Sequence, residues 1–294
     1  MSATEDAASR RPAQPGGSGL RSVRRSIRAA RPVVVRALVL RDFHVSSSYR
    51  LAFLLDIFFG LISLAIYFFI SRTFEDVPSA DLAGAPSYFA YAAVGVALNL
   101  VIQSASVRLG QRMREEQLTG ALELLVAQPV SSTELAVGLA GFHFVFAILR
   151  AIFYVLVAGF VLSANLSNAD WGGFVVMVLV TGAAFSSFGI LAAAAVLVLK
   201  RAELLVTLVV LALSLAGGAF FPIEVLPDWL EPIAKVLPTT FAFDGVRSAL
   251  YQGEDWAVPA LELAAFAVVA VPVAIGLFKL ASDAARRRGT LSTP

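Results

Sequence analysis

The sequence contains no cysteine and only two histidines, His44 and His143, among its 294 residues. The missing cysteine excludes disulfide bonds, thiol chemistry and cysteine metal sites, and with two histidines a histidine-based metal site is not expected. Charged residues make up only 15% of the chain, and the net charge of +2 is too small to indicate a nucleic-acid partner. The first thirty residues contain no apolar core of the kind found in a secretory signal peptide.

Sequence motifs of common enzymes are missing as well. No G-x-x-x-x-G-K-[ST] loop occurs, so this chain is not by itself a P-loop ATPase. Neither the G-x-S-x-G turn of hydrolases nor the H-E-x-x-H helix of metalloproteases is found. We therefore expect no catalytic residue and no metal site, which leaves polar residues inside apolar runs as the candidates for chemistry.

Apolar residues, by contrast, make up 58% of the chain and form six long runs. A helix needs ~20 such residues to cross a bilayer, and helices satisfy their own backbone hydrogen bonds in lipid. The sequence thus predicts an all-α membrane protein with six transmembrane helices. The predicted spans are residues 51–71, 87–107, 135–163, 171–199, 204–221 and 257–281.

The segments before and after the spans are polar or basic. Residues 1–30 are predicted to be a disordered cytoplasmic tail, with an organellar transit peptide as the alternative. Arg31–Val45 is apolar but interrupted by arginines and is too short to span, which favours a helix at the membrane interface. Residues 31–281 then form one membrane domain, and residues 282–294 form a basic cytoplasmic tail.

The basic residues indicate the orientation of the spans. Arginines precede the first span, and Arg108, Lys200 and Lys279 begin basic groups after the second, fourth and sixth. The opposite loops are mainly acidic. Because basic residues concentrate on the cytoplasmic side, both termini and Gln111–Val130 are predicted to be cytoplasmic, with the protein in the plasma (inner) membrane.

Gln111–Val130 is the one polar, helix-patterned segment between long apolar runs. Its apolar positions recur at helical spacing on one face, its acidic positions lie on another, and Pro129 marks its end. Two uses fit such a helix: packing on the membrane surface, or binding by a soluble partner.

The segment Pro222–Asp255 on the outer side carries two helical patterns, at residues 228–236 and 240–251, that are too short to span. Pro227 suits a first helical turn, and Thr239 or Thr240 suits a helix cap. The aromatic content of this segment favours a pair of short re-entrant helices at the outer leaflet; an amphipathic extracellular loop is the alternative.

Asp56, Arg150 and Glu262 are ionisable residues inside the predicted spans, where a charged residue costs ~2.5–3.5 kcal/mol on insertion scales. Arg150 and Glu262 are expected at similar depth toward the outer side, so we predict a possible intramembrane pair. A route-lining role for the two, or no pairing at all, remains open. Asp56 lies near the cytoplasmic end of the first span, where a structural partner is favoured over a proton relay.

Two stretches resemble the type-2 ABC transporter permeases. The first, REEQLTGALELLVAQP at Arg114–Pro129, is similar to the cytoplasmic signature of that family, with Ala121 in place of the commoner threonine. The second, Gly217–Gly253, is similar to the family's outer segment between the last two spans. Together with the six spans, these stretches extend the resemblance over nearly the whole chain after residue 30.

The resemblance implies a permease subunit of an ATP-driven exporter that pairs as a homodimer and docks on a separate ABC ATPase. In that family the cytoplasmic segment is a coupling helix held in a groove of the ATPase. The residues matching it are Glu115, Glu116, Leu118, Gly120, Leu122, Glu123, Leu125 and Pro129. The residues matching the outer segment are Phe221, Pro222, Pro227, Trp229, Pro238 and Arg247. This chain would hold no cofactor, since ATP and Mg²⁺ would bind the partner ATPase.

The resemblance does not specify the cargo. A lipophilic or lipid-linked substrate moved outward is expected, with a lipid-linked glycan as the alternative cargo. Two other classes remain open: an intramembrane lipid-modifying enzyme that uses Asp56, Arg150 and Glu262, and an anchoring protein whose cytoplasmic helix binds a regulator.

Overall fold

A computed structural model describes residues 32–48, 50–73, 82, 84–119, 132–198, 202–253 and 255–288. Every regular element within these ranges is helical, which confirms the predicted all-α class. The longer elements are α2 (Pro32–Ser48), α3 (Arg50–Thr73), α4 (Tyr88–Ser106), α5 (Arg108–Leu118), α7 (Ser132–Phe160), α8 (Trp171–Val198), α9 (Ala202–Ala216) and α12 (Ala257–Arg288). Between α9 and α12 lie the 3₁₀ turn η1 (Ile223–Val225), α10 (Glu231–Ala234), α11 (Pro238–Arg247) and the π-helical turn η2 (Ser248–Gln252).

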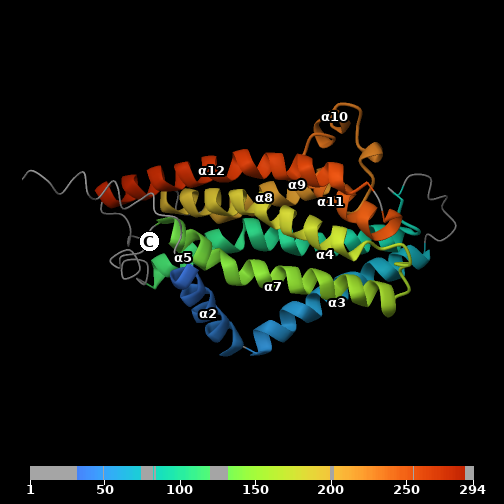
Figure 1. Cartoon of the computed structure of the whole chain (residues 1–294), viewed down its shortest axis with the longest axis horizontal. Coiled ribbons are helices and arrows are strands. Elements are labelled where there is room, and N and C mark those ends of the chain that lie inside the picture. Colours follow the sequence, from blue (N-terminus) through green and yellow to red (C-terminus); the bar gives the residue numbers. More distant parts are fainter. Residues whose placement is uncertain are drawn as a thin grey trace, which may run out of the picture.

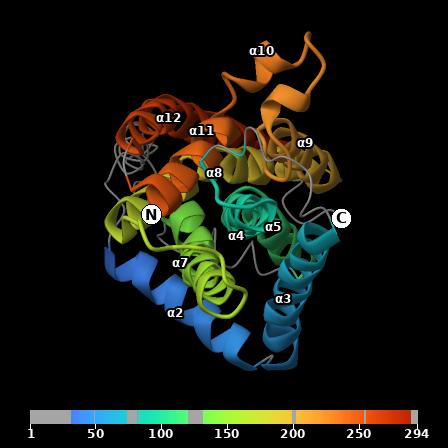
Figure 2. The ribbon, with the colours of Figure 1, turned by 90° about the vertical axis from the view of Figure 1, so that its right-hand side faces the viewer.

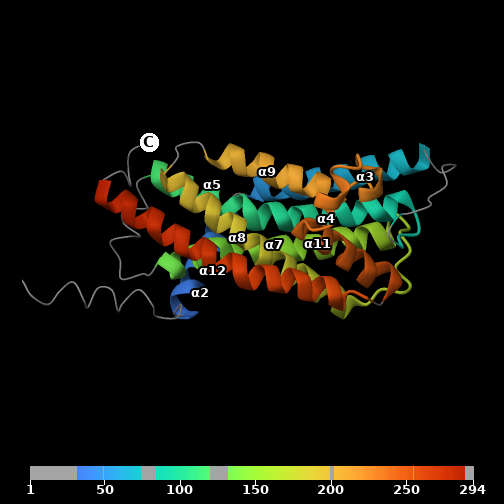
Figure 3. The same ribbon diagram turned by 90° about the horizontal axis from the view of Figure 1, so that it is seen from above.

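Helices α4, α7, α8, α9 and α12 run side by side along the long axis of the molecule (Figures 1 and 3), and α2 lies obliquely to them (Figure 1). α10, α11 and η2 gather at one end of the bundle, here named the α11 end. α5 and the C-terminal part of α12 lie at the opposite end, here named the α5 end (Figure 1). The chain passes from one end to the other along α4 and α5 together and along α7, α8 and α12 (Figure 1).

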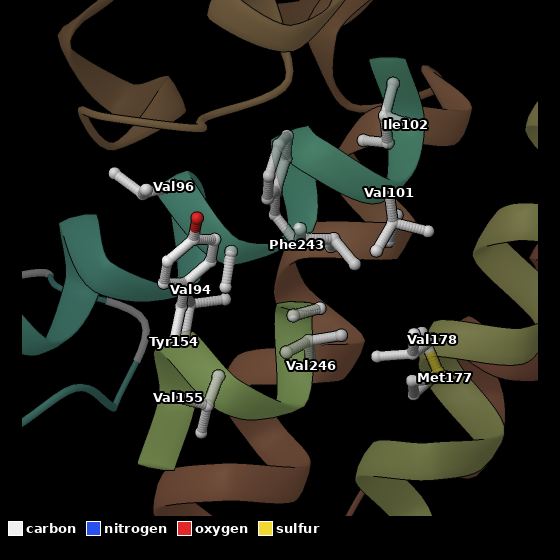
Figure 4. Packing of buried hydrophobic residues seen from close by; sticks show 14 of the residues in the cluster. Val94, Val96, Val101, Ile102, Tyr154, Val155, Met177, Val178, Phe243 and Val246 are labelled. Atoms are coloured by element: carbon white, nitrogen blue, oxygen red, sulfur yellow. The ribbon is translucent and has the colours of Figure 1, made fainter. Parts of the chain in front are cut away.

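α4 is the central helix. It packs against α3, α7, α8, α9 and α11, and seen end-on it lies between them (Figure 2). Its N-terminal half is buried continuously from Phe89 to Asn99, because small residues on all its faces let the neighbouring helices approach closely. Figure 4 shows Val94, Val101 and Ile102 of α4 in one cluster with Tyr154 of α7, Val178 of α8 and Phe243 of α11.

Apolar helices long enough to span a bilayer are present, so the chain is an integral membrane protein. Among the described residues, three helical stretches meet length and hydropathy limits for a span: Tyr88–Glu115, Trp171–Leu197 and Ala257–Ala284. Three shorter apolar stretches, Ile57–Thr73, Phe144–Phe160 and Leu204–Ala216, lie in the other predicted spans. The total of six spans remains a prediction.

Two predicted boundaries differ from the structure. The second span does not end at Val107, because α5 continues α4 after that single turn residue and Gln111 N still donates to Val107 O at 3.1 Å. The fifth helix ends earlier than predicted, at Ala216, since Gly218 adopts the left-handed φ of +83° that closes a helix. The predicted tails at residues 1–30 and 289–294 lie outside the described residues.

Candidate functional site

α4 and α5 together form a rod that connects the two ends of the bundle (Figure 1). At the α11 end the rod contacts the segment between α9 and α12. At the α5 end its last turn forms the first part of the predicted coupling segment. Polar side chains hold the rod at each end, and these two groups of residues form the candidate site.

Arg247 is the central residue at the α11 end. It comes from the last turn of α11 and is 0% exposed. Its guanidinium carbon lies 3.4 Å from the centre of the Tyr91 ring on α4. Its Nη2 donates to the carbonyl oxygens of Gly218 at 2.7 Å and Ala219 at 3.2 Å, and more distantly to Tyr91 O at 3.4 Å. The arginine thereby serves carbonyls just past the C-terminus of α9, where a cation is also favoured by the helix dipole.

Hydroxyl groups tie the same elements together. Tyr91 Oη donates to Gly218 O at 2.8 Å, and Tyr251 Oη of η2 donates to Ala90 O at 2.6 Å. Thr239 Oγ1 of α11 donates to Leu213 O of α9 at 2.8 Å. A polar group buried among apolar helices costs free energy unless it is paired, so these bonds fix α4, α9, α11 and η2 to one another.

Two glycines allow the backbones to approach at this end. A Cβ atom on Gly95 of α4 would collide with the carbonyl oxygen of Ala219. A Cβ atom on Gly217 would collide with the Thr239 hydroxyl that bonds α9. The approach of α4 to the end of α9 therefore depends on Gly95, and the approach of α11 to the end of α9 depends on Gly217.

Asp170 begins α8 at the same end. Its Oδ1 accepts from Gly173 N at 3.0 Å and its Oδ2 accepts from Trp256 Nε1 at 2.8 Å, just before α12. The hydrogen bond from the Gly173 amide, followed by that from Trp256, lowers the pKa of the Asp170 carboxyl below its ordinary value. The carboxylate thus caps α8 and joins it to the start of α12.

The predicted outer-segment residues divide into two groups. Arg247 and Pro238, the first residue of α11, belong to the packed part, whereas Trp229 is 70% exposed and Pro227 is also exposed. The exposed residues lie around α10, which projects from the bundle (Figures 1 and 2). Phe221 and Pro222 connect the two parts and are half-buried.

Three details of the predicted outer helices are wrong. The pattern at residues 228–236 yields a turn and only the short α10, and Pro227 precedes that turn rather than occupying a helical first turn. Neither Thr239 nor Thr240 caps α11, because Leu237 is its N-cap and the threonine hydroxyls bond to carbonyls instead. Pro238 at the first position of α11 has no backbone N–H, so the start of this helix has one fewer donor that needs a capping side chain.

At the α5 end, the buried carboxylate of Asp42 joins α2 to α5. Asp42 is 3% exposed, and its Oδ1 accepts from Arg41 Nε at 3.0 Å and Nη2 at 2.9 Å. Arg112 Nη2 of α5 reaches the same oxygen at 3.4 Å, while its Nη1 lies 3.0 Å from Glu115 Oε2. The sequence offered one signal for this contact, a carboxylate placed directly beside an arginine in an otherwise apolar helix.

Only the first residues of the predicted coupling segment lie within the described part of the chain. Glu115, Glu116 and Leu118 form the last turn of α5, where Glu115 is exposed and Leu118 is 60% exposed. Gly120, Leu122, Glu123, Leu125 and Pro129 lie outside the described residues. Their role in coupling therefore stays a prediction.

The structure does not bring Arg150 and Glu262 together. Arg150 is 5% exposed, lies 5.5 Å from the Phe146 ring centre, and its Nη2 donates to Tyr154 Oη at 3.4 Å. Glu262 is exposed on α12, and among the described residues no ion pair joins the two. The reason is lateral position: α7 packs on α2 and α4, whereas α12 packs on α8 and α11. Asp56 lies on α3, and the structure describes only its backbone.

Tyr91, Tyr251 and Tyr154 are buried residues that the sequence analysis missed. A tyrosine in an apolar run carries a hydroxyl that needs a partner, which was the available signal. Tyr154 Oη donates to Ile57 O of α3 at 2.9 Å, so it joins α7 to the first span. No group of three or more His, Asp or Glu residues that could hold a metal lies in the described part of the chain.

The central part of the chain matches a known protein family. Residues 113–251, from the end of α5 through η2, match the family described as ABC-2 type transporter. The match confirms the resemblance seen in the sequence: residues 113–251 are a membrane domain of the kind found in the type-2 ABC transporter permeases. A search of curated proteins finds no match.

Proposed function

We propose that this permease is the membrane subunit of an ATP-driven exporter and that two copies work together, each docked on a separate ATPase chain. One observation carries the proposal: the α4–α5 rod begins beside Arg247 and ends at Leu118, inside the segment that resembles a coupling helix. Motion applied at the α5 end would act on a rod whose other end is held by polar contacts.

Coupling would follow the helix-in-groove mode of recognition. Leu118, Leu122 and Leu125 would be apolar anchors in the ATPase, and the glutamates of the segment would face basic residues there. ATP bound with Mg²⁺ to the partner would favour one position of this segment over another, which is what a nucleotide must do to shift a conformational equilibrium.

The proposed orientation places the α5 end in the cytoplasm of a plasma-membrane protein. Basic residues lie within α5, in the last turns of α12 and directly after α8 in the sequence, whereas Trp171, Trp229 and Trp256 all belong to segments at the α11 end. Tryptophan concentrates at membrane interfaces and basic residues concentrate inside. In this orientation α2 lies at the inner interface, and α10 and α11 meet the outer leaflet.

The second copy would contact the faces of α3 and α9. These helices flank α4 (Figure 2), and each exposes a row of large apolar side chains. The most exposed are Leu51, Phe59 and Phe69 on α3 and Leu204, Leu205 and Leu208 on α9. A lipophilic or lipid-linked substrate suits a route bordered by such residues.

Co-purification tests the proposal. The permease, expressed at native level with its genomic neighbours, should purify with a P-loop ATPase in equal amounts. Deleting residues 120–130 should release the ATPase while the membrane domain stays folded. If the ATPase stays bound after the deletion, or if a partner without ATPase activity is recovered instead, the proposal is wrong.

A further inference from the structure

We infer that α2 moves together with α5 during transport and that Asp42 is the positioning residue that couples them. The inference rests on the proposed function, because α5 is the element through which the ATPase would act. It assigns a mechanical role to an N-terminal helix that otherwise would be a passive membrane anchor.

The first observation is the way α2 is seated. α2 packs mainly along α7, and two glycines of α7 make this possible. A Cβ atom on Gly138 would collide with Leu38, and one on Gly141 would lie 2.8 Å from Val39 Cγ2. This apolar contact holds α2 beside α7 but gives it no connection to α5.

The second observation is the polar connection across to α5. Asp42 follows Leu38 by one helical turn, so its side chain leaves α2 on the same buried face. Its Oδ1 lies 3.4 Å from Arg112 Nη2, and Arg112 lies one turn before Glu115. The carboxylate therefore joins α2 to the last two turns of the rod.

Because Asp42 is buried, its carboxylate depends on the arginines that face it. A carboxylate that is 3% exposed is stable only where positive charge faces it. Arg41 comes from α2 itself and moves with Asp42. Arg112 is the arginine from another element, so separating α5 from α2 would remove half of the charge that compensates the carboxylate.

The outer face of α2 indicates what the movement would act on. Val33, Leu40 and Phe43 are exposed there, at 77%, 43% and 54%, beside the exposed Arg36. Apolar side chains with an arginine among them suit the headgroup region of a bilayer. An α2 that follows α5 would thus change its position against the inner leaflet in each nucleotide cycle.

Spin-label distances test this inference in the full permease–ATPase complex in nanodiscs. The chain lacks cysteine, so pairs introduced at the exposed positions Ala37 and Gln111, or Gln111 and Asp283, are its only label sites. Labelled permease is diluted with unlabelled permease, and distances are measured without nucleotide and with ATP trapped by vanadate. The Gln111–Asp283 distance reports α5 against α12, and the Ala37–Gln111 distance reports α2 against α5.

In the wild type, the Gln111–Asp283 distance should change with nucleotide while the Ala37–Gln111 distance stays constant. In Asp42→Asn and in Arg112→Gln, the Gln111–Asp283 distance should still change with nucleotide, and the Ala37–Gln111 distance should now change as well. The change in the Ala37–Gln111 distance should be no larger in the double variant than in either single variant. Arg36→Gln, an exposed arginine on α2, should behave as wild type. Arg112 is partly exposed, at 22%, so its variant tests the contact without the folding risk of altering a buried carboxylate.

Two results would overturn the inference. If the Ala37–Gln111 distance changes in the wild type, α2 does not follow α5. If it stays constant in both variants, Asp42 is not what couples the helices. A Gln111–Asp283 distance that never responds to nucleotide is a different failure, because it removes the proposed function and the inference with it.

Discussion

The guanidinium of Arg247 stacks on the ring of Tyr91, with 3.4 Å between the arginine carbon and the ring centre. The tyrosine hydroxyl and the arginine Nη2 then donate to the same carbonyl oxygen, that of Gly218. One carbonyl just past the end of α9 is therefore held by both α4 and α11. This contact holds the α11 end of the rod in place.

Replacing Arg247 by lysine should weaken the α11 end although the charge is kept. Lysine is a point charge without the planar fork of arginine, so it cannot stack on Tyr91 and serve Gly218 and Ala219 together. A buried carbonyl left unpaired costs about 1–3 kcal/mol, so we expect a loss of roughly 3 kcal/mol and a lower Tm in detergent. Lys235→Gln, an exposed change on the same segment, should leave the Tm nearly unchanged. Equal effects of the two changes would contradict the role given to Arg247.

Adding one methyl group at Gly95 should separate α4 from α9. The new Cβ would meet the backbone carbonyl of Ala219, which cannot move without disturbing the Arg247 contacts, so we expect a loss of about 1–3 kcal/mol. Gly276→Ala is the matched control, because nothing lies within 4 Å of a Cβ at that helical position. That change should be neutral or stabilise the protein by roughly 0.5–1 kcal/mol. A Gly95→Ala protein as stable as Gly276→Ala would show that α4 and α9 do not pack as described.

The Tyr154 hydroxyl should hold α3 against α7. Tyr154→Phe removes the donor to Ile57 O and the oxygen that accepts from Arg150, which should cost about 1 kcal/mol. It should also increase proteolytic cleavage within α3. Tyr67→Phe is the control, since Tyr67 contributes a ring stacked at 5.0 Å on Phe220 and phenylalanine keeps that ring. Similar cleavage of both variants would argue against the hydroxyl as the link.

Asp170 should make stability depend on pH in the acidic range. Its pKa is lowered in the folded protein by the Gly173 amide and Trp256. The stabilisation is therefore fully present above the pKa of the unfolded chain, about 4, and is lost as pH falls through the lower folded pKa. In thermal unfolding from pH 7 down to pH 3, Asp170→Asn should be less stable than wild type at neutral pH, and the difference should shrink in acid. A difference in stability between wild type and Asp170→Asn that stays constant from pH 7 to pH 3 would contradict the assignment.

The sequence predicted those parts of the molecule that depend on local patterns. Long apolar runs predicted the helical class, and the motif around Arg247 identified the residue that proves central at the α11 end. Contacts between distant segments were not predictable in this way. Arg150 and Glu262 were placed at a common depth, but depth along a helix axis does not specify which helices are neighbours. The buried hydroxyl of Tyr91 was missed because an apolar run suggests lipid contact unless the partner helix is known. The hydroxyl of Tyr251 was missed because its partner, Ala90 O, is 161 residues away in the sequence.

The ends of helices were the other source of error. α9 ends at Ala216 because Gly218 takes a left-handed φ and its carbonyl is served by Arg247, 29 residues further along the chain. α5 continues past the predicted end of the second span because its polar residues have partners, among them Asp42 and Glu115. Asp42 and Arg247 are distant in sequence from these helix ends, so a sequence window contains neither of them.

Photo-crosslinking from Leu118 in intact cells is the most direct test of the central claim, that the α5 end receives the ATPase. Leu118 is 60% exposed in the last turn of α5, and Trp229, 70% exposed at the opposite end, is the control position. A photoreactive amino acid at Leu118 should crosslink to a P-loop ATPase with a yield that changes when ATP is trapped, whereas one at Trp229 should not. A Leu118 probe that reaches no ATPase, or that is labelled from outside the cell, would contradict the account.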